Sequence, residues 1–373
     1  MNLPKFDYKI QNVNHLDTPT LVVYPERVQH NIDLAINMVG DASRLRPHIK
    51  THKSPDVARL MLAAGISKFK CATIAEAEML GIVGAPDVLL AYQPIGPKLS
   101  RFIEVIKKYP TTRYACLIDN VAAAQAQSVA FEAANLDIPV FIDLNLGQNR
   151  TGIAPDESAI ALFEACSTLK GIHVVGLHGY DGHLRNLDWA VRKADCDAAF
   201  DKLKSVEAEI LRGGKINQLT IVSGGSPSFS VHSKRENVEC SPGTFIYWDK
   251  GYGDLCAEQP FQHAALLVTR VISLPDATKI CLDLGHKSVA SENSINNRVF
   301  FLNAPELVPL SQSEEHLVLE AGEGHAYKVG DVLYGLPYHI CPTVALFERV
   351  FTIENGHVSG EWLTIARDRK ITC

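Results

Sequence analysis

The feature of this sequence that most constrains its fold is a regular alternation, up to about residue 260, of short apolar runs with longer segments of helical periodicity. The runs expected to be strands are residues 45–49, 69–72, 88–92, 113–118, 140–145, 174–177, 219–222 and 244–248. The segments expected to be helices between them are residues 56–64, 74–83, 99–108, 121–134 and 189–211. Strands separated by helices of this length predict βαβ units and a parallel sheet. Eight strands in roughly 200 residues favour a closed (β/α)₈ TIM barrel over an open sheet.

The character of the sequence changes after residue 262. HAALLVTRVISLP, KICLDLGHKS, HLVLEAG, VGDVLYGLP and EWLTIARD read as strands separated by Gly, Pro and Asp turns. We therefore expect a mostly antiparallel C-terminal β-domain, which residues 21–24 join. The predicted division is a barrel over residues 20–262 and a β-domain over residues 1–19 and 263–373.

Composition excludes several classes of protein. The 373 residues carry a formal net charge of −6, which argues against a surface built to bind nucleic acid. The nine cysteines form no Cys-x-x-Cys pair. No apolar run reaches the length of a membrane span, and the N-terminus lacks a secretory pattern. We expect a cytoplasmic protein with reduced thiols and no membrane partner.

The first motif with chemical meaning is RPHIKTHK, residues 46–53. Alternation along a strand puts His48 and Lys50 on one face, and inside a barrel that face is the lumen. A lysine removed from water there can form an imine with a carbonyl cofactor. The alternative is a basic turn whose lysines point to solvent.

Two further motifs stand at strand ends. The first is SGGSPS, residues 223–228. Its glycines leave backbone N–H groups available to bind a phosphate, and Ser223 and Ser226 add hydroxyl donors. The alternative is that the segment is only a flexible loop. In LPYHICPTVAL, His339 and Cys341 share a face if the segment is extended, and imidazole with thiolate favours zinc. The alternative is a buried cysteine beside an ordinary edge histidine.

Together, RPHIKTHK, CATIAEAEML, DLNLGQNRTG, SGGSPS, CSPGTFIYWD, EEH and PYHICPTV resemble the D-threonine aldolase and D-serine dehydratase-like family, pyridoxal-phosphate enzymes related to alanine racemases. The resemblance runs in order through nearly the whole chain and implies a homodimer of barrel-plus-β-domain subunits. It implies His339 and Cys341 as ligands of a divalent metal, zinc or manganese. The cofactor-binding residues expected are Lys50 (the Schiff-base lysine), His48, Arg150, Tyr180, Ser223, Gly224, Gly225, Ser226, Gly243, Thr244 and Tyr247.

The same resemblance implies a lyase acting on D-3-hydroxy amino acids, with Lys50 and either His178 or His183 as catalytic residues. Aldol cleavage to glycine and an aldehyde is the first expectation, because dehydratases of the family have a tyrosine where His178 stands. Dehydration of D-serine or D-3-hydroxyaspartate to a keto acid and ammonia is the alternative, followed by amino-acid racemisation. The non-enzyme alternatives are a pyridoxal-phosphate carrier and a degenerate binding protein.

Overall fold

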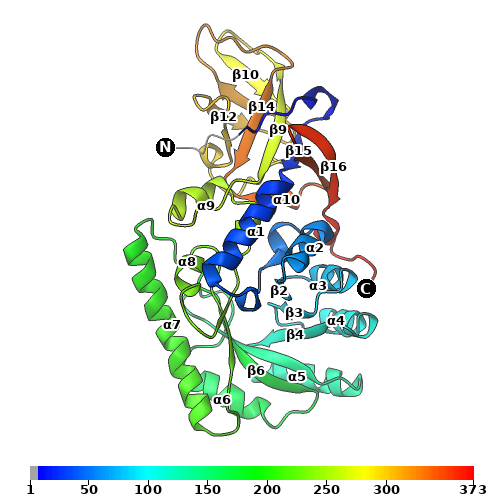
Figure 1. The fold of residues 1–373 in the computed structure, drawn as a ribbon, viewed down its shortest axis with the longest axis vertical. Helices are drawn as coiled ribbons and strands as arrows, with labels where there is room; N and C mark the ends of the chain where they lie inside the picture. The colour runs from blue at the N-terminus through cyan, green and yellow to red at the C-terminus, as the bar shows by residue number, and fades with distance from the viewer. Residues whose placement is uncertain (1–6) are drawn as a thin grey trace.

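Two β-sheets organise the chain in this computed structural model, which describes residues 7–373 (Figure 1). The first six residues of the predicted 1–19 segment lie outside the described residues. In Figure 1 the parallel sheet and its helices form the lower part of the molecule, and the second sheet lies above them. The predicted fold class, an alanine racemase-like barrel with a C-terminal antiparallel β-domain, is confirmed.

Seven parallel strands follow one another in chain order around the barrel. They are β2 (Lys68–Cys71), β3 (Asp87–Leu90), β4 (Arg113–Ile118), β5 (Ile138–Leu144), β6 (Ile172–Gly179), β7 (Thr220–Ser223) and β8 (Val238–Cys240). The eighth position belongs to the extended segment that starts at Leu45. Leu45 bridges Cys240 of β8, and His48 bridges Lys70 of β2, so this segment joins the two edges of the sheet.

One predicted strand is wrong. Residues 244–248 do not extend the sheet: Thr244–Ile246 form a 3-10 helix, and the strand at that end of the barrel is β8. Gly243 precedes this turn and its ideal Cβ would lie 3.1 Å from the carbonyl oxygen of His48, so the chain turns there under the neighbouring segment.

Helices cover the outside of the barrel and begin where side chains cap them. Thr73, Asn120 and Asp156 each accept a hydrogen bond from a backbone N–H in the first turn of the helix that follows, as N-cap residues do. The helices between the strands are α2 (Pro55–Ala63), α3 (Ile74–Ile82), α4 (Pro97–Lys108), α5 (Val121–Ala133), α6 (Glu157–Cys166), α7 (Trp189–Arg212) and α8 (Phe229–His232). The remaining helices are α1 (Pro25–Val39), α9 (Lys250–Leu255) and α10 (Ile340–Val344).

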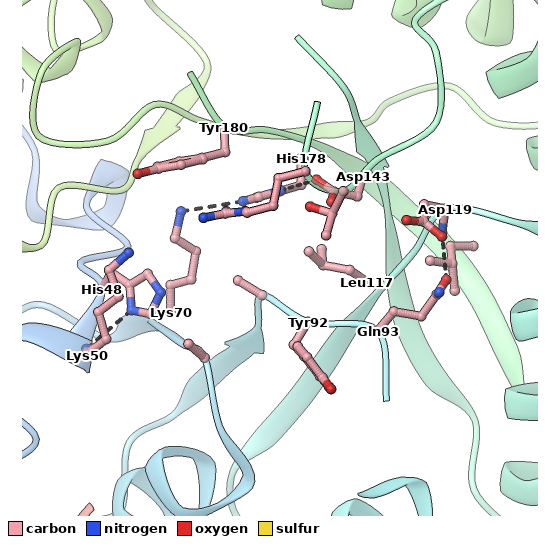
Figure 2. Close-up of a pocket in the computed structure, with 15 residues that line it drawn as sticks. His48, Lys50, Lys70, Tyr92, Gln93, Leu117, Asp119, Asp143, His178 and Tyr180 are labelled. Carbon is pink, nitrogen blue, oxygen red and sulfur yellow. Dashed lines mark hydrogen bonds and ion pairs between the residues drawn. The ribbon is translucent and has the colours of Figure 1, made fainter. Parts of the chain in front are cut away.

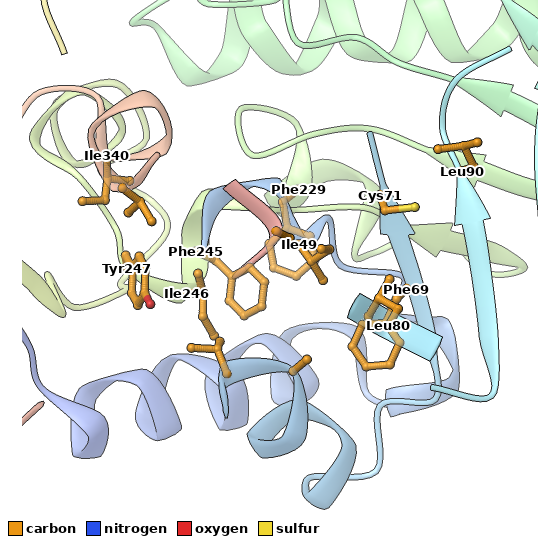
Figure 3. Close-up of a cluster of buried hydrophobic side chains, with 14 of the residues drawn as sticks. Ile49, Phe69, Cys71, Leu80, Leu90, Phe229, Phe245, Ile246, Tyr247 and Ile340 are labelled. Atoms are coloured by element: carbon orange, nitrogen blue, oxygen red, sulfur yellow. The ribbon is translucent and has the colours of Figure 1, made fainter. Parts of the chain in front are cut away.

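Strand alternation separates two apolar layers. Outward-facing residues such as Phe69 and Cys71 pack against the helices in the main core, which continues through Tyr247 to Ile340 of α10 (Figure 3). A smaller cluster made by inward-facing residues fills the lower lumen: Leu89, Ala115, Leu117, Phe141 and Val222. This apolar floor leaves the upper lumen to polar side chains.

The β-domain draws its strands from both ends of the chain. They are β1 (Thr20–Val23), β9 (Ala265–Ser273), β10 (Lys279–Leu282), β11 (Val299–Phe301), β12 (Val308–Gln312), β13 (Leu317–Glu320), β14 (Val332–Pro337), β15 (Arg349–Glu354) and β16 (His357–Leu363). β1 lies between β9, to which it is antiparallel, and β15, to which it is parallel. Residues 21–24 were expected to join this domain, and the pairing of β1 with β9 and β15 agrees with that expectation. Within residues 7–373, no helix is both long and apolar enough to cross a membrane.

Candidate active site

A cavity of about 570 Å³ opens at the carboxyl ends of the barrel strands (Figure 2). Active sites of (β/α)₈ barrels lie at this end of the strands, because the loops that follow the strands converge there. The residues lining the cavity are His48, Lys50, Lys70, Ala72, Ala91, Tyr92, Gln93, Leu117, Ile118, Asp119, Asp143, Arg150, Thr151, His178 and Tyr180. Five of them are residues predicted from sequence: His48, Lys50, Arg150, His178 and Tyr180.

Lys50 stands at the wall of this cavity, in the 3-10 turn Ile49–Thr51 that follows the eighth barrel position. Nδ1 of His48 accepts a hydrogen bond from the backbone N–H of Lys50 at 3.3 Å, which fixes the turn. Burial, and then the charges of Lys50 and Lys70, hold the pKa of His48 well below its usual value. His48 is therefore a neutral acceptor that positions the backbone of Lys50.

Tyr180, directly after β6, presents its ring to three cations. Nζ of Lys50 lies 5.7 Å from the ring centroid, Nζ of Lys70 lies 5.8 Å from it, and the guanidinium carbon of Arg150 lies 5.1 Å from it. Arg150, at the end of the β5 loop, is itself exposed. The ring therefore gathers side chains from the 3-10 turn Ile49–Thr51, from strand β2 and from the loop after β5.

His178 and Asp143 form a buried pair on neighbouring strands. Asp143 of β5 and His178 of β6 occupy matching positions in the ladder, and Nδ1 of His178 lies 2.7 Å from Oδ1 of Asp143. The carboxylate accepts the Nδ1–H, so the acceptor lone pair of the imidazole is on Nε2. Burial lowers the pKa of His178 although Asp143 opposes this effect, so the imidazole is neutral and able to take up a proton.

Lys70 was not predicted from sequence. Its Nζ lies 3.4 Å from Nε2 of His178, and the residue is only 2% exposed (Figure 2). In KFKC, Phe69 and Cys71 face the core, so strand alternation alone sends Lys70 into the lumen. That alternation was the available signal.

The loops after β7 and β8, which contain the residues predicted to bind phosphate, contact each other. The hydroxyl of Ser226 accepts hydrogen bonds from the backbone N–H groups of Gly243 (3.4 Å) and Thr244 (3.2 Å). Gly224 adopts φ +85°, and an ideal Cβ on Gly225 would lie 2.8 Å from the Tyr180 ring. Gly225 thus lets the loop lie close to the ring of Tyr180, which Nζ of Lys50 also approaches. Ser223 is used differently, because its hydroxyl donates to the carbonyl of Gly179.

This arrangement fits pyridoxal phosphate on grounds of shape and donors. A primary amine and a glycine-rich loop pair approach the same aromatic ring, and the cavity beside it has room for a small planar ligand. Lys50 would hold the carbonyl carbon, and the loops around Ser226 and Thr244 would hold the phosphate.

His339 and Cys341 also meet, although not as an extended pair. α10 begins directly after His339, so Cys341 lies in the first helical turn, where Pro342 is tolerated. The segment is therefore not extended at Cys341, but the imidazole and the thiol still lie close enough for each to shift the pKa of the other. Nδ1 of His339 lies 2.5 Å from Oε1 of Glu292. Burial raises the pKa of Cys341, but the hydrogen bond and charge of His339 outweigh burial and lower it. Sγ of Cys341 lies 3.1 Å from Oγ1 of Thr51, so Cys341 reaches the Lys50 turn.

A second group with metal-ligating atoms was not predicted. Ligand atoms of Asp181, Cys196 and His232 all lie within 4.8 Å of one another, and all three residues are buried. They already bond to one another: Nε2 of His232 lies 2.8 Å from Asp181, whose other oxygen accepts from Ser228 at 2.6 Å. Ser228 in turn accepts the N–H of Gly225 at 3.2 Å. This network holds the loop of residues 223–228 in place.

Ten of the fifteen predicted site residues do not line the cavity, and two of these ten, His183 and Tyr247, also stand apart from the groups described above. His183 packs against Gly147 of the β5 loop, where an ideal Cβ would lie 2.8 Å from its Nε2. Tyr247 is fully buried in the main core, and its hydroxyl has no hydrogen-bond partner among residues 7–373 (Figure 3). Their assignment to catalysis and cofactor binding has no support from these positions.

Comparison with known families agrees with this geometry. The family model described as alanine racemase, N-terminal domain, matches residues 23–250, and the model described as putative serine dehydratase domain matches residues 264–353. A D-threonine aldolase from Arthrobacter sp is 26% identical over 94% of this chain and 93% of its own length.

Solved structures share the whole architecture. The D-threonine aldolase from Filomicrobium marinum superposes with a TM-score of 0.85 at 26% identity, covering 94% of this chain and 96% of that one. The D-threo-3-hydroxyaspartate dehydratase from Delftia sp. HT23 superposes with a TM-score of 0.79 at 25% identity, covering 94% of this chain and 98% of that one. Two further solved structures are variants of a D-threo-3-hydroxyaspartate dehydratase. In one, which is metal-free, a cysteine is replaced by alanine, and in the other a histidine two positions before that cysteine is replaced by alanine. Because the first family model spans more than half of the chain, this protein belongs to the alanine racemase-like pyridoxal-phosphate enzymes, in the family of D-threonine aldolases and D-serine dehydratases.

Proposed function

We propose that this protein is a metal-dependent lyase that cleaves D-3-hydroxy amino acids to glycine and an aldehyde. One observation carries the proposal: Lys50 and the His178–Asp143 pair line one cavity, and Cys341 reaches the same Lys50 turn. An amine, a neutral base and a pair of metal-ligating side chains are the groups that this cleavage needs.

Each group has a distinct task. When bound, pyridoxal phosphate would draw electrons from Cα, and a divalent ion on His339 and Cys341 would polarise the β-hydroxyl. Asp143 holds the Nδ1–H of His178, so the proton-accepting groups on this part of the cavity wall are Nε2 of His178 and the amine of Lys70 beside it. Loss of the hydroxyl proton and cleavage of the Cα–Cβ bond yield the aldehyde, and protonation of Cα yields glycine. The apolar floor of the lumen excludes water from below.

Product analysis tests the reaction. The protein, loaded with pyridoxal phosphate and Mn²⁺ or Zn²⁺, would be incubated with D-threonine, D-3-hydroxyaspartate and D-serine. We expect glycine and an aldehyde from the 3-hydroxy substrates, and loss of turnover with EDTA. Appearance of the L-isomer instead, with no effect of EDTA, would identify a racemase. A cofactor absorbance band without turnover of any of these substrates would identify a binding protein.

Dehydration is the second candidate, and one observation favours it. His339 and Cys341 are two positions apart, as are the histidine and cysteine replaced in the dehydratase variants, one of which is metal-free. A keto acid and ammonia from D-serine or D-3-hydroxyaspartate would establish this reaction. His178 favours aldol cleavage, because it puts a base rather than a phenol on the cavity wall.

The assembly and the division of the chain stay predictions. A homodimer, the commonest closed assembly, predicts elution near twice 40.9 kDa in size-exclusion chromatography. We also propose the boundary after residue 262, and limited proteolysis near that position would test it.

A further inference from the structure

Lys70 is a buried lysine without a carboxylate partner. It is 2% exposed, and Nε2 of His178 is the one hydrogen-bond partner of its Nζ in the part of the chain that the structure describes. Lysines are rarely buried unless an anion compensates the charge, because removing an ammonium group from water is costly. A lysine kept in the lumen at this cost, facing a cavity, indicates a functional role.

The position of Lys70 alters the part that His178 can play. Nδ1 of His178 is bound to Asp143, and Nε2, its proton-accepting atom, lies next to Nζ of Lys70. A ligand in the cavity therefore meets the amine of Lys70 at the place where it would otherwise meet the imidazole. The amine can turn towards the ligand or towards His178, because its protons are on a terminal group that rotates.

We propose that Lys70 is the catalytic residue that exchanges a proton with the ligand hydroxyl, and that His178 and Asp143 are positioning residues behind it. This inference rests on the proposed function for the identity of the hydroxyl. The step is a proton transfer alone: the O–H bond of the ligand breaks, an N–H bond forms on neutral Lys70, and the resulting ammonium donates to Nε2 of His178. The ammonium of Lys70 gives the same proton back at Cα, which yields glycine and restores the neutral amine, so no other reactant is consumed.

The charges around Lys70 support a neutral amine near pH 7. Burial, followed by the charge of Lys50, lowers the pKa of Lys70 from its usual 10.5 to about 7, and Arg46 acts in the same direction. Asp143 and Asp181 oppose this shift. The other polar groups that face it are His48 across the strand bridge, His178, and the ring of Tyr180.

Competitive labelling with acetic anhydride, read by peptide mass spectrometry, tests the charge state without any turnover. The protein is labelled across pH 6 to 10, and each lysine is normalised to the denatured chain. We expect Lys70 to become reactive near pH 7 rather than near the usual lysine value of 10.5, with the exposed Lys202 labelled alongside as the internal control. A Lys70 that becomes reactive only near pH 10, or stays unreactive at every pH, overturns the proposal.

Substitution tests the proton transfer itself. Lys70→Met keeps the volume and Lys70→Arg keeps a charge that cannot be lost, and we expect each to lower kcat by about 10²-fold, as loss of a general base does. Methylamine should restore part of the activity of Lys70→Ala, more strongly as pH rises, and alkylammonium salts of lower pKa should act at lower pH. Full activity of Lys70→Met, or no rescue of a folded Lys70→Ala, overturns the role. If wild-type protein turns over no substrate, the proposed function fails, whereas the labelling result still stands.

Discussion

The guanidinium of Arg46 contacts Glu239 at 2.7 Å across the point where the barrel closes. Arg46 belongs to the segment that occupies the eighth position, and Glu239 belongs to β8. Arg46 also pairs with Asp87 of β3, and Lys68 of β2 pairs with Glu239. Charged side chains from four neighbouring barrel positions therefore join the two edges of the parallel sheet, where the backbone pairing consists of isolated bridges.

Replacing Glu239 by Gln should cost stability at this seam. Arg46 would keep Asp87 but lose its second carboxylate, and removing one partner of a buried ion pair costs about 3 kcal/mol. Urea unfolding followed by circular dichroism measures the change. Glu209→Gln, which removes half of an exposed pair on α7, is the matched control and should stay within about 0.5 kcal/mol. Equal stability of the two variants would contradict a closing role for Glu239.

Gly224→Ala should weaken the retention of pyridoxal phosphate. Gly224 has φ +85°, and its ideal Cβ would lie 2.6 Å from the His232 ring, so the loop must move. Gly214→Ala is the control, since φ there is +72° but nothing lies within 4 Å of the ideal Cβ. Both variants carry backbone strain of about 1 kcal/mol, so the difference between them isolates the collision. We expect at least tenfold weaker cofactor binding in Gly224→Ala alone, measured by equilibrium dialysis and absorbance.

Metal content should separate the two groups of candidate ligands. We expect Cys341→Ala to lose its divalent ion in elemental analysis after dialysis, because a lone imidazole is a poor site. Asp181→Asn should retain the ion, since the contacts of Asp181 with His232 and Ser228 hold the loop of residues 223–228. Cys281→Ala, which removes a thiol in the β-domain, is the control for handling. Metal loss in Asp181→Asn with retention in Cys341→Ala would place the metal site at Asp181, Cys196 and His232 instead.

The pH dependence of stability should reveal Lys70. Its pKa is about 7 in the folded protein and 10.5 in the unfolded chain, so between these values the unfolded chain binds more protons. The contribution of Lys70 to the free energy of unfolding therefore increases as pH rises from 7 to 10. Below pH 7 the amine is charged in the folded protein, so the full cost of burying that charge is present. Lys70→Met lacks this dependence, so its advantage over wild type should be greatest below pH 7 and shrink by several kcal/mol towards pH 10. Lys202→Met is the control, and parallel pH profiles for wild type and Lys70→Met would refute the shift.

Much of the barrel could be predicted because its strands carry their own signal. β4 begins and ends at the residues predicted, since the run RYACLI is apolar and flanked by polar residues. β8 could not be found in the same way. It has three residues, one of them the ion-paired Glu239, so its apolar pattern is too short to see, whereas the apolar TFIYW next to it imitates a strand.

The candidate site was predictable where a motif stands at a strand end. Lys50 and Tyr180 fall in such places, and the structure puts both on the cavity wall. Tyr247 does not line the cavity, because its side chain points into the core after the 3-10 turn. The residue types in this segment do not indicate that direction. Lys70 was overlooked because a single lysine within a strand carries no motif. Its role depends on His178, which lies 108 positions further along the chain.

The central place of β1 in the β-domain has a consequence for biosynthesis. β1 leaves the ribosome well before both of its neighbours, since β9 and β15 begin at Ala265 and Arg349. All barrel strands are complete by Cys240, so the barrel can assemble while β1 still has two unpaired, apolar edges. A nascent or truncated chain that ends before β15 exposes an aggregation-prone strand that the finished protein conceals completely, and it is at this stage that the chain most needs a chaperone.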